Sequence, residues 1–477
     1  MILTLAIILG FYGCSTEDPT KINEAQILVT IDDKIITVSD FIRRSEYNVR
    51  PSYCNGNSVE DKQIILNSLI AEKLIALESE FDLTEPHMQI LEGRKEQKMR
   101  EVLYNRHIYN KVKIDSLELN IVYDNSRKDF IISYITFPDK QLMIELKNSL
   151  EDSTFTFEEW VKNMDAIDTI PTRKINYNED VTEDMYEAFF SKEVQLGQIF
   201  GPVMMGDYYS IFRVDGWKES RNLSASQNIH EITTLKKTMK DIKAHIDYRR
   251  YINSLMQDKK LQLHAENFEK LVMNIHTHLK ELPLDESELV IRDMPVYTKY
   301  SMNLSENDVL FTISDKEWTI GDLDDLIRRD PVIIPGKVNE KVLKKILKNS
   351  IIKKIEAFYI TQDAYEKSID QHYLVIQEVT VWSDYIKSTQ WISHMIQTSG
   401  YTRTETDNNT IFNELLNPIF DSLMVKYSEV IDVNEHYFSE INLSSIDMHT
   451  FYNEQSHSLV VPLFPITTTK QKVDYLK

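Results

Sequence analysis

An alternation of apolar and polar residues near the start of the chain occurs again in its second half. Residues Leu28–Asp40 align without gaps to residues Leu310–Asp322. In each copy the alternating residues predict a short strand, an Asp-Lys pair predicts a tight turn, and the chain then enters a helix. The identical positions are Leu28/Leu310, Thr30/Thr312, Ile31/Ile313, Asp33/Asp315, Lys34/Lys316, Thr37/Thr319 and Asp40/Asp322. The sequence therefore contains an internal repeat.

Each copy continues with two predicted helices. Thr37-x-x-Asp40 and Thr319-x-x-Asp322 are capping-box variants, in which the Thr hydroxyl accepts a hydrogen bond from a free amide and the carboxylate reaches back. A second, amphipathic helix follows in both copies, with its apolar residues on one face. These apolar residues are Leu66, Leu69, Ile70, Leu74 and Leu77 in the first copy and Leu347, Ile351, Ile355 and Phe358 in the second.

A third element recurs further along the chain. Tyr251–Met256 is similar to Ile419–Met424, and each leads into a short alternating segment, Leu261–Leu263 or Val430–Val433. The first copy is much longer than the second, by about the size of a small domain. We therefore expect the first copy to carry an inserted domain that the second copy lacks.

Composition favours a mainly α-helical chain with several domains. At 477 residues the chain exceeds what one hydrophobic core usually serves, and 42% apolar residues suffice to bury real cores. The low counts of Gly, 11, and Pro, 13, favour helices over a loop-rich or all-β fold. The formal net charge of −21 repels phosphate backbones, which argues against nucleic acid as a partner.

The N-terminus resembles a lipoprotein signal peptide. The apolar run Ile2–Leu9 is too short to span a bilayer, and it ends before Gly13, Cys14 and a polar segment. The resemblance implies lipidation of Cys14, a membrane anchor, and a place in the cell envelope on the periplasmic side of the outer membrane. The sequence departs from the pattern because no Lys or Arg precedes the apolar run and the bulky Tyr12 replaces a small residue. The alternative is an ordinary secretory or buried segment.

The repeated unit resembles the N-terminal chaperone module of SurA and PrsA foldases. The strand, turn and helix, followed by the helix with the pattern Ile65-Leu-x-x-Leu-Ile-x-x-Lys-Leu74, carry this resemblance. The Asn-Ser-Leu element at residues 253–255 resembles the helix by which those chains return to the module. The resemblance implies that the chain binds unfolded or partly folded exported polypeptides.

Residues 127–219 fill the extra length of the first copy and resemble a parvulin peptidyl-prolyl isomerase domain. The matching pieces, in family order, are a strand at Asp129–Phe137, a helix at Phe155–Val161, a helix at Met185–Phe190, a loop at Leu196–Val203 and a strand at Tyr209–Val214. The loop, L-G-Q-I-F-G-P-V, is the most specific piece. The resemblance implies an α+β domain inserted into the first module.

The catalytic residues of parvulins are replaced in this chain. Parvulins grip the proline ring in an apolar pocket beneath two hydrogen-bonded histidines, which helps the amide to cross a barrier of about 20 kcal/mol. The resemblance places Tyr134 and Ser210 at the two histidine positions, and Met185 and Phe190 in the pocket. We therefore expect the domain to be inactive, although Tyr134 and Ser210 could share a hydrogen bond that supports weak activity.

No cofactor and no metal site are expected from the sequence. His276 and His278 alternate, but no carboxylate or third histidine has fitting spacing, so we assign both to a linker. Phosphate-binding loops and the familiar hydrolase motifs do not occur. Cys54 lies in an Asn-Gly-Asn loop and is expected to be a bystander thiol.

The expected fold is mainly α and multidomain: a duplicated SurA N-terminal-like helical chaperone module with an inserted α+β parvulin-like domain. The expected parts are a signal peptide at 1–14, a linker at 15–25, the first module at 26–126, the degenerate parvulin-like domain at 127–219, return helices that complete the first module at 220–275, a linker at 276–305, the second module without insertion at 306–445, and a C-terminal tail at 446–477, in which Leu459–Leu463 is expected to add a strand.

The leading functional hypothesis is an exported chaperone, a holdase or foldase for unfolded envelope or secreted polypeptides. Two alternatives stay open. One is an active peptidyl-prolyl cis-trans isomerase with a remodelled Tyr134/Ser210 pair. The other is a scaffold lipoprotein that binds one fixed partner.

Overall fold

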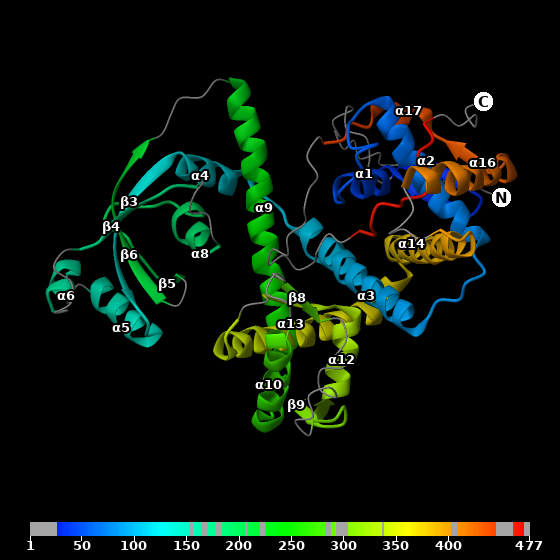
Figure 1. Cartoon of the computed structure of the whole chain (residues 1–477). Coiled ribbons are helices and arrows are strands. Elements are labelled where there is room, and N and C mark those ends of the chain that lie inside the picture. Colours follow the sequence, from blue (N-terminus) through cyan, green and yellow to red (C-terminus); the bar gives the residue numbers. More distant parts are fainter. Residues whose placement is uncertain are drawn as a thin grey trace, which may run out of the picture. The chain divides into compact units, whose positions relative to one another are not determined.

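The computed structural model describes residues 26–152, 156–163, 170–177, 183–205, 208–219, 225–281, 288–291, 304–335, 338–401, 408–444 and 461–471. The fold is mainly α with four small sheets among the described residues, as the composition predicts (Figure 1). The chain divides into two compact units. The outer unit contains the residues up to Val102 and from Lys259 onwards, and the inserted unit is Leu103–Asp258. Cys14 and the expected signal peptide lie outside the described residues.

Both copies of the repeat form the strand, turn and helix that the pattern predicts. The first copy consists of β1 (Ile27–Ile31), β2 (Lys34–Thr37) and α1 (Val38–Glu46), and the second of β9 (Val309–Ile313), β10 (Lys316–Thr319) and α12 (Ile320–Arg329). The capping boxes at Thr37 and Thr319 are both confirmed. One feature was not predicted: the residues after each turn form a second strand, so that each motif is a hairpin. Ile36 in β2 and Trp318 in β10 are buried, which explains why these short segments stay extended.

Each hairpin takes its third strand from a part of the chain other than the one expected. The segment β7 (Leu261–Leu263) pairs with β9 of the second hairpin, and β12 (Ile431–Val433) pairs with β1 of the first. The segment 220–275, with its return helices, was predicted to complete the first module. This prediction is wrong for β7, the strand within the segment, because β7 pairs with the second hairpin. The second module likewise does not close on its own return strand.

Loop closure gives a physical reason for this exchange. The two hairpins share most of their strand residues, so the local sequence cannot decide which hairpin β7 joins. β7 is separated from β9 by the helix α10 (Ala265–Glu281) and residues 282–308, which include β8 (Glu288–Ile291), whereas β1 lies more than 200 residues before β7. A shorter connection costs less entropy to close, so β7 joins the nearer hairpin and leaves the first hairpin for β12. α10 also corrects a boundary, because His276 and His278 lie within this helix and not in a linker.

The core of the outer unit joins the beginning of the chain to its end. Helix α2 (Val59–Glu78) packs against α14 (Tyr373–Thr398) and α16 (Asn417–Lys426), and Leu66, Ile70 and Phe420 lie in one buried cluster (Figure 1). The predicted apolar faces are largely confirmed, since Leu66, Leu69, Ile70, Leu74, Leu347, Ile351 and Ile355 are all buried.

The helix α3 (Glu85–His107) packs against the second hairpin's helices. A Cβ atom at Gly93 would lie 1.9 Å from the Arg329 carbonyl oxygen, so only glycine permits this approach. Arg329 pairs with Glu96 at 2.8 Å, and Arg100 donates to Thr361 at 2.8 Å on α13 (Glu340–Glu366). The remaining described elements of the outer unit are β8 (Glu288–Ile291), β11 (Val332–Pro335), η3 (Ile369–Gln371), α15 (Asn408–Ile411), η4 (Phe412–Leu416) and α17 (Glu435–Glu440).

The inserted unit is built on a four-stranded sheet in the order β4-β3-β6-β5, with antiparallel neighbours. Both faces of the sheet carry buried side chains, because the apolar residues of its central strands alternate between two clusters. Its strands are β3 (Lys128–Phe137), β4 (Thr172–Ile175), β5 (Ile199–Met205) and β6 (Tyr208–Glu219). Its helices are η1 (Tyr109–Lys111), α4 (Ser116–Ser126), α5 (Lys140–Glu151), α6 (Phe157–Asn163), α8 (Glu183–Met185), η2 (Tyr186–Phe190) and α9 (Ala225–Met256).

The described part of the C-terminal tail forms neither a helix nor a strand. Residues 461–471 are irregular, and most of their side chains are buried or half-buried. The expected strand at Leu459–Leu463 is therefore wrong for residues 461–463, and its first two residues lie outside the described part of the chain. None of the helices that the structure describes is long and apolar enough to cross a membrane.

The strand pairing predicts which engineered cysteines can join. In a chain carrying Cys14→Ser and Cys54→Ala, we expect a disulfide from the pair Thr30→Cys and Asp432→Cys, because these residues face each other across β1 and β12. Thr312→Cys and Gln262→Cys should join for the same reason across β9 and β7. The measurement is mobility in a non-reducing gel, with peptide mapping by mass spectrometry.

The matched controls exchange the partners. Thr30→Cys with Gln262→Cys, and Thr312→Cys with Asp432→Cys, should stay reduced under the same mild oxidation. Efficient bridging of the exchanged pairs, with none in the first two variants, would contradict the observed pairing and restore the pairing expected from the sequence.

Candidate functional site

The residues predicted for the isomerase pocket gather on one face of the sheet in the inserted unit. Tyr134 on β3 lies directly opposite Phe212 on β6, and Ser210 lies opposite Thr136. Residues directly opposite each other across a ladder point to the same face, so Tyr134 and Ser210 are diagonal neighbours there. The Ser210 hydroxyl forms a hydrogen bond with the Thr136 hydroxyl at 2.9 Å. Ser210 is thus engaged with the residue across from it.

Helical residues cover this face of the sheet and fill it. Met185 ends α8 and is 2% exposed, and Phe190 in η2 is 0% exposed. The Phe190 ring packs edge-on against Tyr177 at a centroid distance of 5.1 Å, and Phe189 contacts Phe200 at 4.8 Å. Burial raises the pKa of the Tyr177 hydroxyl to about 12. The residues expected to line a pocket are therefore part of a packed aromatic core.

Only Tyr134 among the four predicted pocket residues is more than marginally exposed. Ser210 is 2% exposed, like Met185, whereas Tyr134 is half-buried at the edge of the cluster. Isomerisation requires the proline ring to be gripped in a pocket, whereas Met185, Phe190 and Ser210 are buried among neighbouring side chains. In this arrangement the four residues stabilise the sheet and offer at most one tyrosine hydroxyl at its surface.

The loop that was the most specific sequence match runs into β5. Gly197 and Gly201 both have left-handed backbones, with φ of 78° and 116°. A Cβ atom at Gly201 would lie 2.6 Å from the Ser210 carbonyl oxygen, so this glycine is required for β5 to approach β6. The loop therefore has a structural reason for its glycines that is independent of catalysis.

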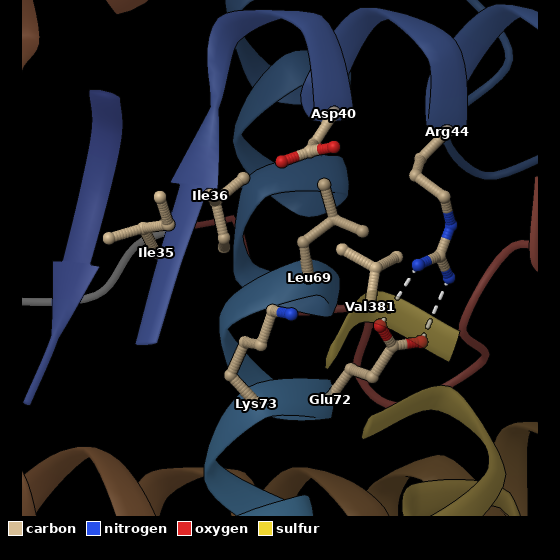
Figure 2. A pocket seen from close by; sticks show the side chains of 8 residues that line it. All are labelled: Ile35, Ile36, Asp40, Arg44, Leu69, Glu72, Lys73 and Val381. Carbon is tan, nitrogen blue, oxygen red and sulfur yellow. Dashed lines mark hydrogen bonds and ion pairs between the residues drawn. The ribbon is translucent and has the colours of Figure 1, made fainter. Parts of the chain in front are cut away.

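A second cluster of polar residues, which was not predicted, lies in the outer unit beneath the first hairpin. Arg44 on α1 forms two hydrogen bonds with Glu72 on α2, at 2.9 and 2.8 Å. Both side chains are almost fully buried. Figure 2 shows this pair at one side of a small pocket, whose lining also includes Asp40, Leu69 and Lys73. The enclosed space is about the size of one water molecule, so the pocket does not take a substrate.

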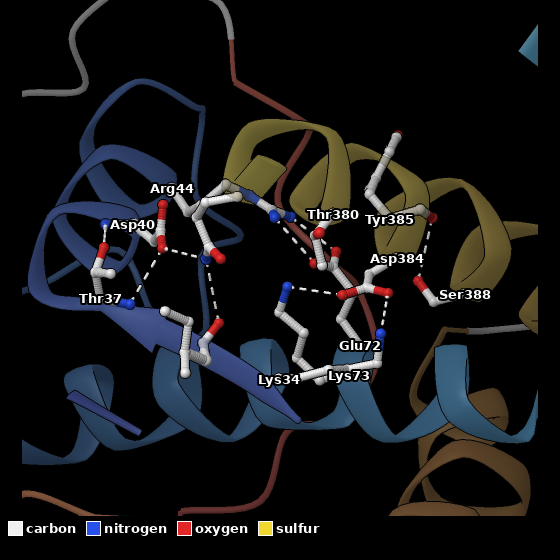
Figure 3. Close-up of polar contacts among 12 residues, drawn as sticks. Lys34, Thr37, Asp40, Arg44, Glu72, Lys73, Thr380, Asp384, Tyr385 and Ser388 are labelled. Atoms are coloured by element: carbon white, nitrogen blue, oxygen red, sulfur yellow. Dashed lines mark hydrogen bonds and ion pairs between the residues drawn. The ribbon is translucent and has the colours of Figure 1, made fainter. Parts of the chain in front are cut away.

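Asp384 on α14 is the second centre of this cluster. Its two carboxylate oxygens accept from Lys34 at 2.6 Å and from Lys73 at 2.8 Å (Figure 3). Lys73 and Asp384 are 4% and 3% exposed, so both charges are withdrawn from water. One carboxylate thereby connects β2, α2 and α14. Both lysines are held by Asp384, so neither is presented as a nucleophile. The cluster instead fixes the positions of β2, α2 and α14.

The sequence carried a weak signal for this cluster. Glu72, Lys73 and Asp384 are charged residues inside otherwise apolar helical stretches, and such residues are rarely buried without partners. Lys34 is one of the identical positions of the repeat, but its counterpart Lys316 lies 4.5 Å from the centroid of the Trp318 ring. Lys34 and Lys316, which occupy the same position in the two copies, therefore have different partners.

Cys54 is buried in the core of the outer unit. Burial raises the pKa of its thiol to about 12, so almost no thiolate exists at neutral pH. Among the residues that the structure describes, no group of three or more His, Cys, Asp or Glu side chains is placed to hold a metal ion.

The Asp384 cluster leads to a stability prediction. Asp384→Asn leaves the buried Lys73 and the half-buried Lys34 without their carboxylate, so we expect the outer unit to lose about 3–5 kcal/mol of unfolding free energy. The measurement is denaturant unfolding followed by tryptophan fluorescence, since Trp382 and Trp391 lie on α14.

An exposed ion pair provides the matched control. Glu266→Gln removes the partner of Lys270 on the surface of α10, and it should leave the unfolding midpoint unchanged. Equal midpoints for Asp384→Asn and Glu266→Gln would contradict the role assigned to Asp384.

Comparison with known proteins gives one distant likeness. No family model matches the sequence, and no curated protein is similar to it. Among solved structures, the crystal structure of the peptidylprolyl isomerase PrsA from Bacillus cereus is a weak neighbour, with 15% sequence identity over 47% of this chain and 87% of that chain. Its TM-score is 0.19, which is too low for the likeness to carry an argument about fold or function.

Proposed function

We propose that this protein is a chaperone of the holdase or foldase type, which binds extended segments of unfolded polypeptides. The observation that carries the proposal is that the outer unit already holds an extended segment, residues 461–471, by donating hydrogen bonds to its main-chain carbonyl groups. Main-chain groups are the same in every polypeptide, so this kind of contact tolerates many sequences. A chaperone for unfolded chains needs such tolerance.

The two hairpin modules of the outer unit add to this support. Each combines a three-stranded sheet with amphipathic helices, and both belong to one chain. Two weak binding surfaces on one chain raise the effective concentration of the second contact once the first has formed. A single unfolded client can then be retained without strong binding at either surface.

In this proposal the inserted unit binds or positions clients and does not catalyse isomerisation. Met185, Phe190 and Ser210 are buried, and parvulin catalysis needs an open pocket beneath paired histidines. A large aromatic cluster in their place supports a stable, non-catalytic domain.

An active isomerase is the second candidate, and one observation favours it. Tyr134 is half-buried on the same face as the hydrogen-bonded pair Thr136 and Ser210, near the ends of the two central strands β3 and β6. Such hydroxyls could replace histidines as hydrogen-bond donors to a twisted amide.

Suppression of aggregation tests the chaperone function. A chemically denatured client is diluted into buffer with the full-length chain, and light scattering is followed. We expect scattering to fall strongly at about equimolar chaperone for several unrelated clients. An inert protein of similar net charge serves as the control for simple electrostatic effects.

Two results would contradict the holdase. Scattering equal to that with the inert protein would remove the proposed function altogether. Protection of one client with none of the others would instead fit a scaffold that binds one fixed partner.

A proline-tetrapeptide assay with the full-length chain decides between the two candidates. We expect the cis-to-trans rate to equal the uncatalysed rate, with an active parvulin measured in parallel as a positive control. Acceleration that disappears in both Tyr134→Phe and Ser210→Ala would establish the isomerase instead.

A further inference from the structure

The C-terminal segment 461–471 lies against α1 and α2 as an extended strip without strand pairing. In Figure 1 it is part of the red end of the chain. Two of its apolar side chains point outward, since Leu463 is 66% and Ile466 is 45% exposed. Phe464, between them, is 7% exposed and belongs to the same buried cluster as Phe420. One aromatic anchor thus holds a segment in which Leu463 and Ile466 face solvent.

Three further contacts are made to backbone carbonyl groups of the segment. Asn48 donates to the Pro462 carbonyl at 2.9 Å, and Arg44 donates to the Leu463 carbonyl at 2.8 Å. Asn67 donates to the Lys470 carbonyl at 2.7 Å. These three donors come from α1, its C-terminal flank and α2, and they are spaced along an extended chain. These three hydrogen bonds depend on the path of the backbone and not on the side chains of the segment.

One of these donors is positioned independently of the tail. Both terminal nitrogens of Arg44 are held by Glu72, and the same guanidinium reaches the tail carbonyl. A bidentate carboxylate fixes the plane of a guanidinium, so the donor stays oriented when the tail leaves. The buried ion pair of Figure 2 therefore forms part of a preorganised binding surface.

The far end of the segment has polar anchors on α2 and α16. The Asn417 side chain accepts from the Thr468 hydroxyl at 2.7 Å and donates to the Thr469 hydroxyl at 3.0 Å. The Thr467 hydroxyl donates to the Ser68 carbonyl at 3.1 Å. Hydroxyl-rich segments suit this end of the surface.

We propose that this surface, formed by Arg44, Asn48, Asn67, Ser68 and Asn417 and called the tail groove below, is the client-binding site, and that residues 461–471 occupy it as a competitor within the chain. The inference rests on the proposed chaperone function and deepens it by naming the site. The ligand class is an extended polypeptide segment with one buried aromatic residue, proline neighbours and hydroxyl side chains after it.

A client can take the place of the tail because each hydrogen bond to a backbone carbonyl of the tail can be made equally to a backbone carbonyl of the client. A client's carbonyl groups take over the hydrogen bonds of the tail, so no buried donor is left without an acceptor. The tail itself has the advantage of being tethered, which corresponds to a local concentration in the millimolar range. Only abundant or multiply bound unfolded segments then displace it, which protects the groove from occasional partners.

A reversible covalent lock tests the competition. Asn417 and Thr469 touch through their side chains, so Asn417→Cys and Thr469→Cys, in a chain with Cys14→Ser and Cys54→Ala, can form a disulfide that holds the tail in the groove. We expect the oxidised chain to lose most of its protection of denatured clients and reductant to restore it. The comparison uses one protein in two redox states, so it does not depend on how the variant compares with the original chain.

A labelled peptide with the sequence of residues 461–471 provides a second measurement. Phe464→Ala weakens the resident tail by removing its buried ring, so we expect the peptide to bind this variant roughly 10²-fold more tightly than the original chain. Leu463→Ala is the matched control, since Leu463 is exposed, and it should leave peptide binding unchanged. Adding Asn67→Ala to Phe464→Ala should weaken the peptide again.

The outcomes separate this inference from the proposed function. If the oxidised and reduced forms protect clients equally, or if the peptide binds the Phe464→Ala and Leu463→Ala chains alike, the tail groove is not the client site although the chaperone function stands. If neither redox form protects clients, the proposed function fails, and peptide exchange alone then decides whether the groove binds extended segments. Should Phe464→Ala unfold the chain, seen as lost circular dichroism, the redox comparison decides the inference.

Discussion

The carboxylate of Asp384, shared by Lys34 and Lys73, is the interaction on which the outer unit depends. It joins the first hairpin, the second helix after it, α2, and the helix α14 from the second half of the chain. Burying these charges costs solvation energy that only their mutual attraction and good geometry offset. The cluster therefore favours one arrangement of α2 and α14, because any slip of one helix along the other would strand a buried charge.

The neighbouring pair of Arg44 and Glu72 extends this constraint to the end of the chain. Because Glu72 fixes the guanidinium, Arg44 can also receive the carbonyl of Leu463 in the tail. One set of buried charges thus positions the hairpin, the helices and the extended segment. The same set supplies the donor that the proposed client site needs, so stability and binding share residues in this unit.

The inserted unit brings together on one sheet residues that are far apart in the sequence. The pieces of the parvulin pattern fall on strands and helices of one small sheet, and Tyr134, Ser210, Met185 and Phe190 share a face. Met185, Phe190 and Ser210 are buried, so they contribute to the packing of the inserted unit. Aromatic rings bury large apolar areas, so the buried Phe189 and Phe190 stabilise the sheet of the inserted unit.

Local sequence patterns were enough to predict the tight turns, the capping boxes at Thr37 and Thr319, the amphipathic helices and the mainly α fold. These depend on residues within a few positions of one another, where backbone preference and periodicity act directly. Only the tertiary structure decided which hairpin β7 and β12 join, which charges meet at Asp384, and where residues 461–471 lie. Those contacts join residues hundreds of positions apart, and the two copies of the repeat offer nearly equal edges, so chain connectivity and burial make a choice that local sequence leaves open.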